Sequence, residues 1–133
     1  PTHAIPELRT DNNSFPLSGA PLALTVKTLS TFYIRFVPVK QSGNGLTGVV
    51  SSSTTDALLA KTMKIHPLSA YSADVHATFS SSAPPLTGAN DNGAWEAVLN
   101  EMQALRVTEG SPRNYFGIVK TGYQSGIAGI SFI

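Results

Sequence analysis

Histidine is the residue type in this 133-residue chain that most directly permits metal chemistry, and it occurs at His3, His66 and His76. A zinc hydrolase needs ligands held in one rigid geometry, usually two histidines one helical turn apart with a glutamate between them, because the helix then aims both rings at one ion. No His-Glu-x-x-His sequence is present. We therefore interpret the histidines as ordinary surface or partly buried side chains and predict no metal ligands in this chain.

Carboxylates and hydroxyls form no catalytic constellation either. Glu96 and Glu101 lie five residues apart on a predicted helix, where they do not share a face, so we expect solvated carboxylates and no acid/base pair. Ser111, Ser125 and Ser131 lack the Gly-x-Ser-x-Gly sequence that positions a nucleophilic serine. The sequence predicts no catalytic residue.

The closing segment 126–133, Gly-Ile-Ala-Gly-Ile-Ser-Phe-Ile, carries the remaining chemical signal. It is predicted to be an apolar strand, and such a strand exposes side chains and backbone groups unless further chain covers it. Small residues let another extended backbone approach, and an edge strand pairs with a peptide through its free N–H and C=O groups. Two interpretations stay open: the segment recognises a main chain, or it is an interior strand whose neighbour lies in further chain. We therefore expect this chain to be a piece of something larger.

Low charge limits the classes of partner. The chain is 41% hydrophobic but only 13% charged, with a net charge of +1, so its polar surface comes largely from Ser, Thr, Asn and Gln. Nucleic-acid binding needs clustered Lys and Arg, which are scattered here, so we expect no nucleic-acid partner. No run approaches the roughly 20 apolar residues of a membrane helix, and we expect no membrane partner. The absence of cysteine excludes disulfides but does not decide the compartment. Because an uncharged polar surface is common in secreted bacterial proteins, we expect a secreted or cell-surface bacterial protein.

Turn-forming residues and periodicity divide the chain into two parts. Residues 1–21 carry four prolines and predict a linker or the trailing edge of a β domain, followed by a strand candidate at 22–27. Residues 41–45 are expected to be a mobile loop. The other elements have strand or helix periodicity. In order they are strand 32–39, helix 57–63, strand 74–79, helix 95–105, strand 115–119 and the closing strand 126–133.

Two of these elements bear on the sheet. In the strand 32–39, Ile34 and Phe36 share one face, and Pro38 places the strand's end at an edge or bulge because proline donates no ladder hydrogen bond. The strand 115–119 is nearly all apolar, which predicts burial on both faces. Alternation of strands and helices predicts the α/β class, with a mixed, mostly parallel sheet and two covering helices, preceded by a β or irregular segment.

The stretch Phe-Tyr-Ile-Arg-Phe-Val-Pro-Val at 32–39, and the stretch Asn-Tyr-Phe-Gly-Ile-Val at 114–119 leading into Gly-Ile-Ala-Gly-Ile at 126–130, carry a resemblance. The pattern resembles secreted bacterial zinc metallopeptidases of metzincin type. The resemblance implies that residues 31–133 are the N-terminal part of a metallopeptidase-like α/β domain, an incomplete metzincin-like upper subdomain. It also implies that residues 1–30 are a linker or the trailing strand of a preceding immunoglobulin-like domain.

The resemblance implies a role for the closing segment. In such enzymes the corresponding edge strand holds the peptide substrate antiparallel above the zinc, so Gly129, Ile130 and Ser131 are expected to make backbone contacts with a peptide or protein substrate. The zinc-binding helix and its third histidine are expected downstream of Ile133. Zinc is then a cofactor of the full-length parent, while this chain supplies the sheet and the substrate-binding strand and is inactive alone.

Two other functions stay open from the sequence. Low charge, abundant Ser and Thr and many β segments also suit a non-enzymatic extracellular adhesion or carbohydrate-binding module, with Tyr33, Tyr71 and Tyr123 as exposed contacts. A third possibility is a small structural domain that self-associates through its C-terminal strand. A His-Glu-x-x-His sequence in the reading frame beyond Ile133 favours the peptidase, whereas a stop codon favours the other two.

Overall fold

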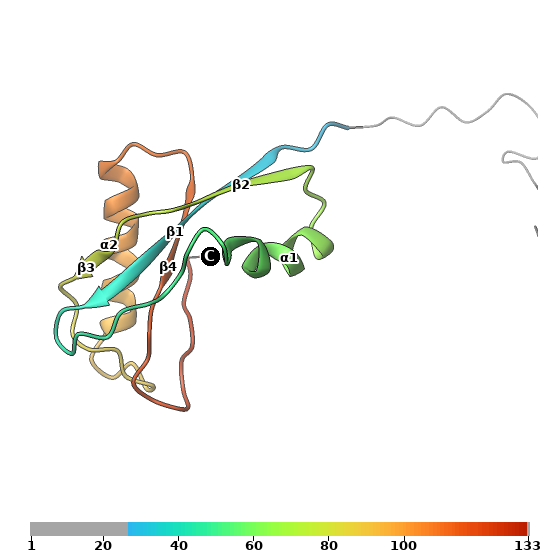
Figure 1. Ribbon diagram of the computed structural model, residues 1–133. Helices are drawn as coiled ribbons and strands as arrows, with labels where there is room; N and C mark the ends of the chain where they lie inside the picture. The colour runs from blue at the N-terminus through green and yellow to red at the C-terminus, as the bar shows by residue number, and fades with distance from the viewer. Residues whose placement is uncertain (1–26, 133) are drawn as a thin grey trace, which may run out of the picture.

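One central strand pairs with all the remaining described strands, and this pairing defines the architecture. The computed structural model describes residues 27–132. In that range the elements are β1 (Thr31–Gln41), α1 (Thr55–Ile65), β2 (Ala70–Val75), β3 (Phe79–Ser81), α2 (Ala94–Thr108) and β4 (Asn114–Ile118). β2, β3 and β4 each pair with β1 in parallel. This arrangement (Figure 1) confirms the predicted α/β class with a mostly parallel sheet and two helices.

β1 is the interior strand of the sheet. β2 pairs with its first half and β3 with its end, while β4 pairs with its middle on the opposite side. The register runs from Thr31↔Ala70 to Phe36↔Val75 for β2, from Val39↔Phe79 to Gln41↔Ser81 for β3, and from Ile34↔Asn114 to Pro38↔Ile118 for β4. β2 and β3 thus form one broken edge, and β4 forms the other edge within the described residues.

Pro38 lies inside β1, and its missing N–H falls at a gap in the sheet. The N–H of His76 donates to the C=O of Phe36 (2.8 Å), so even-numbered residues of β1 direct their backbone groups toward the β2/β3 side. Pro38 faces the gap between β2 and β3, where the neighbouring chain leaves the ladder. The predicted strand 32–39 is therefore too short at its C-terminal end. β1 continues to Gln41, a residue that was expected in a mobile loop.

The two helices cover opposite faces of the sheet (Figure 1). The buried core under α2 consists of Val37, Val39, Ala83, Leu86, Ala94, Trp95, Val98 and Met102. The buried core under α1 consists of Ile34, Phe36 and Leu59. Residues of β1 alternate between the two cores because successive side chains of a strand point to opposite faces. This core includes Ala83 and Leu86 from the loop before α2, and Tyr115 of β4 packs against it.

The side-chain amides of Asn90 and Asn92 cap the N-terminus of α2. The N–H of Ala94 donates to Oδ1 of Asn92 (3.1 Å), and the N–H of Trp95 donates to Oδ1 of Asn90 (3.0 Å). These two bonds satisfy donors that the first helical turn leaves free. The indole N–H of Trp95 donates to the C=O of Thr87 (3.1 Å), which fixes the loop against the helix. Both predicted helices are confirmed, and neither of the helices described within 27–132 is long and apolar enough to span a bilayer.

Three strand predictions differ from the structure. Residues 126–132 form no strand. β4 is not buried on both faces, since Phe116 is 54% exposed. It is also an edge strand, because β1 is its only described neighbour. A run of apolar residues does not by itself distinguish an interior strand from an edge strand. The strand expected at 74–79 instead spans the break between β2 and β3, with no strand at 76–78. The candidate at 22–27 lies outside the described residues apart from Lys27.

Candidate functional site

An open apolar groove of about 740 Å³ lies beside β4. α2 and β4 form one side of it, and the segment 128–132 forms the other. In Figure 1 the chain turns after β4 and returns beside that strand to the C-terminal end. Side chains that line the groove include Trp95, Leu99, Met102, Phe116, Ile130 and Phe132. A groove bordered by apolar side chains and by the backbone of a strand is suited to an extended peptide chain.

The outer edge of β4 presents unpaired backbone groups to this groove. Odd-numbered residues of β1 direct their backbone N–H and C=O groups toward β4. In the parallel register, the residues of β4 whose backbone groups point toward β1 are therefore Asn114, Phe116 and Ile118. The N–H and C=O groups of Tyr115, Gly117 and Val119 therefore point outward. They make no hydrogen bond with other residues in the described range. β4 thus offers a regular row of donors and acceptors.

The structure places Gly129, Ile130 and Ser131 on the wall of the groove that faces β4. All three are exposed, Ile130 to 38%, and nothing lies within 4 Å of the position that a Cβ of Gly129 would take. Their backbone makes no hydrogen bond with the residues described here. The three residues predicted from the sequence to contact a substrate therefore border the groove, although they do not belong to a strand.

A close backbone contact anchors the start of this segment. The N–H of Ile127 donates to the C=O of Gly88 (3.0 Å), and the hydroxyl of Tyr123 donates to the C=O of Ile127 (2.5 Å). Gly126 has φ of +111°, and a Cβ there would lie 2.3 Å from the carbonyl oxygen of Gly88. Glycine is therefore required at this turn. The turn fixes the direction in which residues 128–132 leave the body of the protein.

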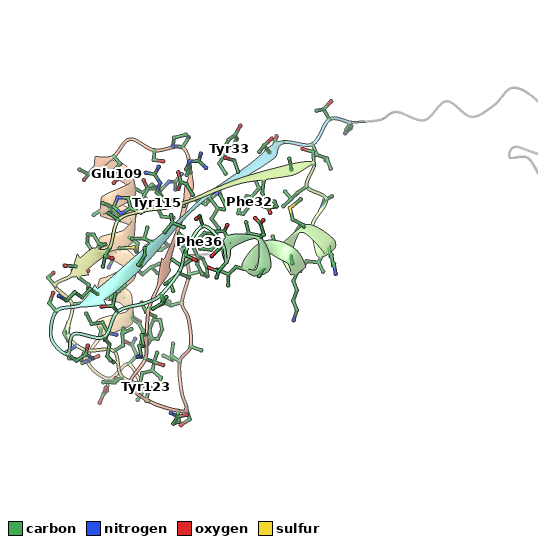
Figure 2. The ribbon with its side chains drawn as sticks, in the orientation of Figure 1. Phe32, Tyr33, Phe36, Glu109, Tyr115 and Tyr123 are labelled. Carbon is green, nitrogen blue, oxygen red and sulfur yellow. The ribbon has the colours of Figure 1, made fainter. Side chains whose placement is uncertain are left out.

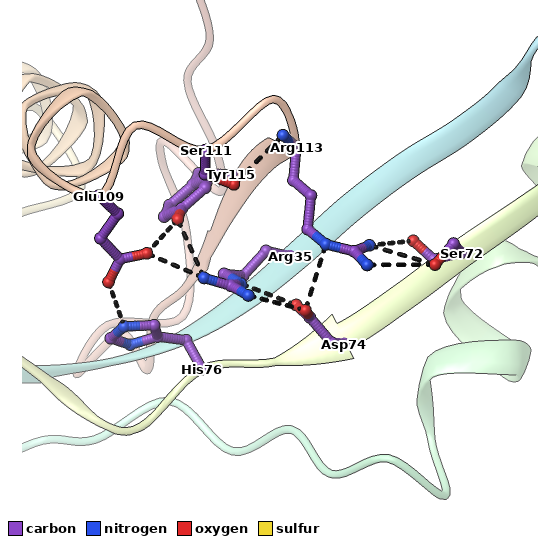
Figure 3. Close-up of polar contacts among 8 residues, drawn as sticks. All are labelled: Arg35, Ser72, Asp74, His76, Glu109, Ser111, Arg113 and Tyr115. Atoms are coloured by element: carbon purple, nitrogen blue, oxygen red, sulfur yellow. Dashed lines mark hydrogen bonds and ion pairs between the residues drawn. The ribbon is translucent and has the colours of Figure 1, made fainter.

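A second polar feature, the charged cluster, joins the sheet to the end of α2 (Figure 3). It consists of Arg35, Asp74, His76, Glu109, Arg113 and Tyr115. Arg35 donates to both carboxylate oxygens of Asp74 (2.9 Å each) and to Glu109 (2.9 Å). Nε of Arg113 lies 3.2 Å from Oδ2 of Asp74, which also accepts from Nη2 of Arg35. The bidentate geometry makes the Arg35–Asp74 pair the strongest link of the cluster.

Hydrogen bonding stabilises the ionised carboxylates of the charged cluster. Hydrogen bonds from Arg35 hold the pKa of the Asp74 carboxyl below its usual range, against the opposing effect of partial desolvation. The Tyr115 hydroxyl, with smaller contributions from His76 and Arg35, likewise lowers the pKa of Glu109. Nε2 of His76 lies 2.7 Å from the remaining oxygen of Glu109. Since these charges are paired with one another, the cluster serves to tie β1, β2, β4 and α2 together.

The histidines and helix carboxylates offer no metal site in the described range. His66 is exposed, both ring nitrogens of His76 contact oxygens of the protein, and His3 lies outside the described residues. No group of three or more His, Cys, Asp or Glu residues within 27–132 is placed to hold a metal ion. Glu96 is exposed as expected, but Glu101 is not simply solvated. Its Oε1 accepts from the backbone and hydroxyl of Ser82, while Oε2 is buried without a partner.

The tyrosines of the alternative binding function do not form one surface. Tyr33 is 48% exposed and packs under the guanidinium of Arg113. The hydroxyls of Tyr71 and Tyr123 are hydrogen-bonded within the chain, that of Tyr71 to Asp56. Figure 2 shows Tyr33 near the start of β1 and Tyr123 beyond the opposite end of the sheet. These positions give no shared platform for a sugar or protein ligand.

Comparison with known proteins adds no assignment. No protein-family model, no curated protein and no solved structure matches this chain.

Proposed function

We propose that this chain is the N-terminal part of an exported bacterial zinc metallopeptidase of metzincin type. In this proposal the chain supplies the sheet and the backbone that holds the peptide substrate. The observation that carries it is the position of Gly129–Ser131, whose exposed backbone borders an apolar groove. The motifs at 32–39 and 114–130 support the same assignment. The low charge and the uncharged polar surface support export.

The geometry is suited to holding an extended peptide. The open space at Gly129 lets a second backbone come within hydrogen-bonding distance. Side chains of that peptide then alternate between solvent and the apolar wall formed with Ile130 and Phe132. Pairing along the segment orders several peptide bonds at once, which lowers the entropic part of the barrier to reaction at one of them.

The described residues do not fit a zinc ion, because they hold no cluster of suitable ligands. We therefore place the zinc ligands and the general base downstream of Ile133 and assign no chemical step to this chain. Its contribution is to bind and orient the substrate. Tight stoichiometric binding of zinc by the 133-residue chain, measured by calorimetric titration, would contradict this division of roles.

The reading frame beyond Ile133 gives the first test. A His-Glu-x-x-His sequence soon after Ile133 is expected, with a third histidine further on. A longer chain that includes these residues is expected to bind zinc and to cleave unfolded protein substrates, while the 133-residue chain does neither. A stop codon directly after Ile133 refutes the proposal.

A proline scan of the longer chain tests the role of the closing segment. Adjacent residues of a paired strand direct their N–H groups to opposite sides, so a bound peptide uses either Gly129 and Ser131 or Ile130. Proline removes the N–H group. Substitutions of one parity are therefore expected to raise KM about 10-fold or more, since one lost hydrogen bond in a desolvated contact is worth about 1.5 kcal/mol. Equal losses at Gly129, Ile130 and Ser131 would indicate general disruption and contradict backbone pairing.

A further inference from the structure

The edge of β4 lacks the features that keep edge strands apart. β4 contains neither a charged residue nor a proline, which are the usual means of blocking strand addition. Phe116, at its centre, is 54% exposed, and Tyr115, Gly117 and Val119 direct free backbone groups outward. We propose that two copies of this chain associate by antiparallel pairing of β4 with β4 of the second copy. This inference goes beyond the peptidase proposal and does not depend on it.

One register of this pairing uses every free backbone group. It places Gly117 opposite Gly117 of the second copy and Tyr115 opposite Val119 of the second copy. Each of these pairs exchanges an N–H···O=C bond in both directions. A shift by two residues in either direction leaves part of the row unpaired. The edge is therefore complementary to itself, as an interface with two-fold symmetry requires.

The same register brings exposed apolar side chains together. Phe116 lies opposite Ile118 of the second copy in a pair without direct hydrogen bonds, where side chains approach most closely. The Phe116 ring already contacts Phe36 edge-on, with centroids 5.8 Å apart, so its orientation is fixed before association. Pairing thus removes apolar surface from water on the face of the sheet that α1 covers.

Charge and the closing segment do not oppose association. The net charge of +1 gives little repulsion between two copies. Residues 128–132, which lie across the groove from β4, form no hydrogen bond with the described residues, so a second copy that displaces them breaks none. A second copy supplies its own strand already ordered on β1, so little conformational entropy is lost on pairing.

Sedimentation velocity from micromolar to millimolar protein, combined with hydrogen exchange at each concentration, tests the inference. The mass is expected to double from 14.0 kDa. Over the same range, exchange is expected to slow at the amides of Tyr115, Gly117 and Val119. A monomer at all concentrations overturns the inference, as does a dimer in which these amides stay unprotected. Protection that does not vary with concentration also overturns it, since the groups are then paired within one chain.

A matched pair of lysine variants locates the interface. Phe116→Lys places a charge at the edge of β4, whereas Phe132→Lys makes the same change at a residue that is 59% exposed outside that edge. Phe116→Lys is expected to keep the monomer mass at concentrations where the unchanged chain and Phe132→Lys are dimers. Equal effects of the two changes overturn the assignment to β4. If Phe116→Lys does not fold, the exchange pattern of the unchanged chain decides the question.

Discussion

Replacement of Gln41 with leucine tests whether one buried amide holds the end of the sheet together. The side chain of Gln41 is 1% exposed. Its Nε2 donates to the C=O of Lys120 (2.6 Å), and its Oε1 accepts from the N–H of Leu86 (2.9 Å) and from the amide of Asn44 (3.2 Å). The end of β1 is thus tied to the chain before α2 and to the chain after β4. Leucine has a similar size but leaves these groups without partners.

The magnitude follows from the burial of each group that loses its partner. Leu86 is buried, so its N–H bears the full penalty of an unpaired buried donor, about 1–3 kcal/mol. Lys120 is exposed, so water replaces part of the bond to its carbonyl. We expect Gln41→Leu to lower the free energy of unfolding by about 2–4 kcal/mol in total.

Urea titration measures this loss. The fluorescence of Trp95, the only tryptophan of the chain, reports on the adjacent core. Gln124→Leu is the matched control, because Gln124 is exposed and its replacement is expected to change stability by less than about 0.5 kcal/mol. If Gln41→Leu costs no more than this control, the three hydrogen bonds do not hold the loops and the reasoning is refuted.

Two further changes test the charged cluster and the turn before the closing segment. Arg35 lowers the pKa of Asp74, so the stabilisation from Asp74 is complete above the ordinary aspartate pKa of about 3.9 and is lost as pH falls through the lower folded value. The urea midpoint of Asp74→Asn is expected to be lower at neutral pH and to fall less on acidification than that of Asp91→Asn; equal slopes contradict the pairing. Gly126→Ala is expected to cost about 1–3 kcal/mol because of its positive φ and close contact. Gly129→Ala, which meets nothing within 4 Å, is its control and is expected to cost less than about 0.5 kcal/mol in the same assay.

The helices and the central strand could be predicted because their signals are local. Trp95, Val98 and Met102 recur at three- and four-residue spacing, and all three are buried on the face of α2 that meets the sheet. Ile34 and Phe36 alternate with residues that face the other core, as a strand requires. Each pattern depends only on neighbours along the chain, so it can be recognised without knowledge of the fold.

The charged cluster and the buried amide could not be predicted, because their partners are distant in sequence. Arg35 meets Asp74 after 39 positions and Glu109 after 74. Gln41 lies beyond the predicted strand 32–39 and precedes Ser, Gly and Asn, a composition that indicates a loop, yet its side chain is almost fully buried. Alternation along β1 places Arg35 on a face, but nothing in the local sequence shows which carboxylates reach that face.

The closing segment shows where prediction from residue types stops. Gly129–Ser131 border the groove, while their contact with another backbone stays a prediction. The prediction of a strand at 126–133 is wrong for the described part, because a strand requires a neighbour and residues 126–132 have none among the described strands. Pairing is a property of two segments, whereas composition describes one.

Peptide binding at Gly129–Ser131 and dimer formation through β4 both use backbone groups that no described residue hydrogen-bonds. Further residues after Ile133 are expected to affect the two differently. An edge has one row of outward N–H and C=O groups, so a second copy at β4 competes with any strand that further residues of the same chain add there. A longer chain that covers β4 is therefore expected to be monomeric, and Phe116→Lys is then expected to have no effect on its mass. Loss of the dimer on lengthening would place β4 inside the complete sheet, whereas a dimer that persists leaves this edge free for assembly in the longer protein.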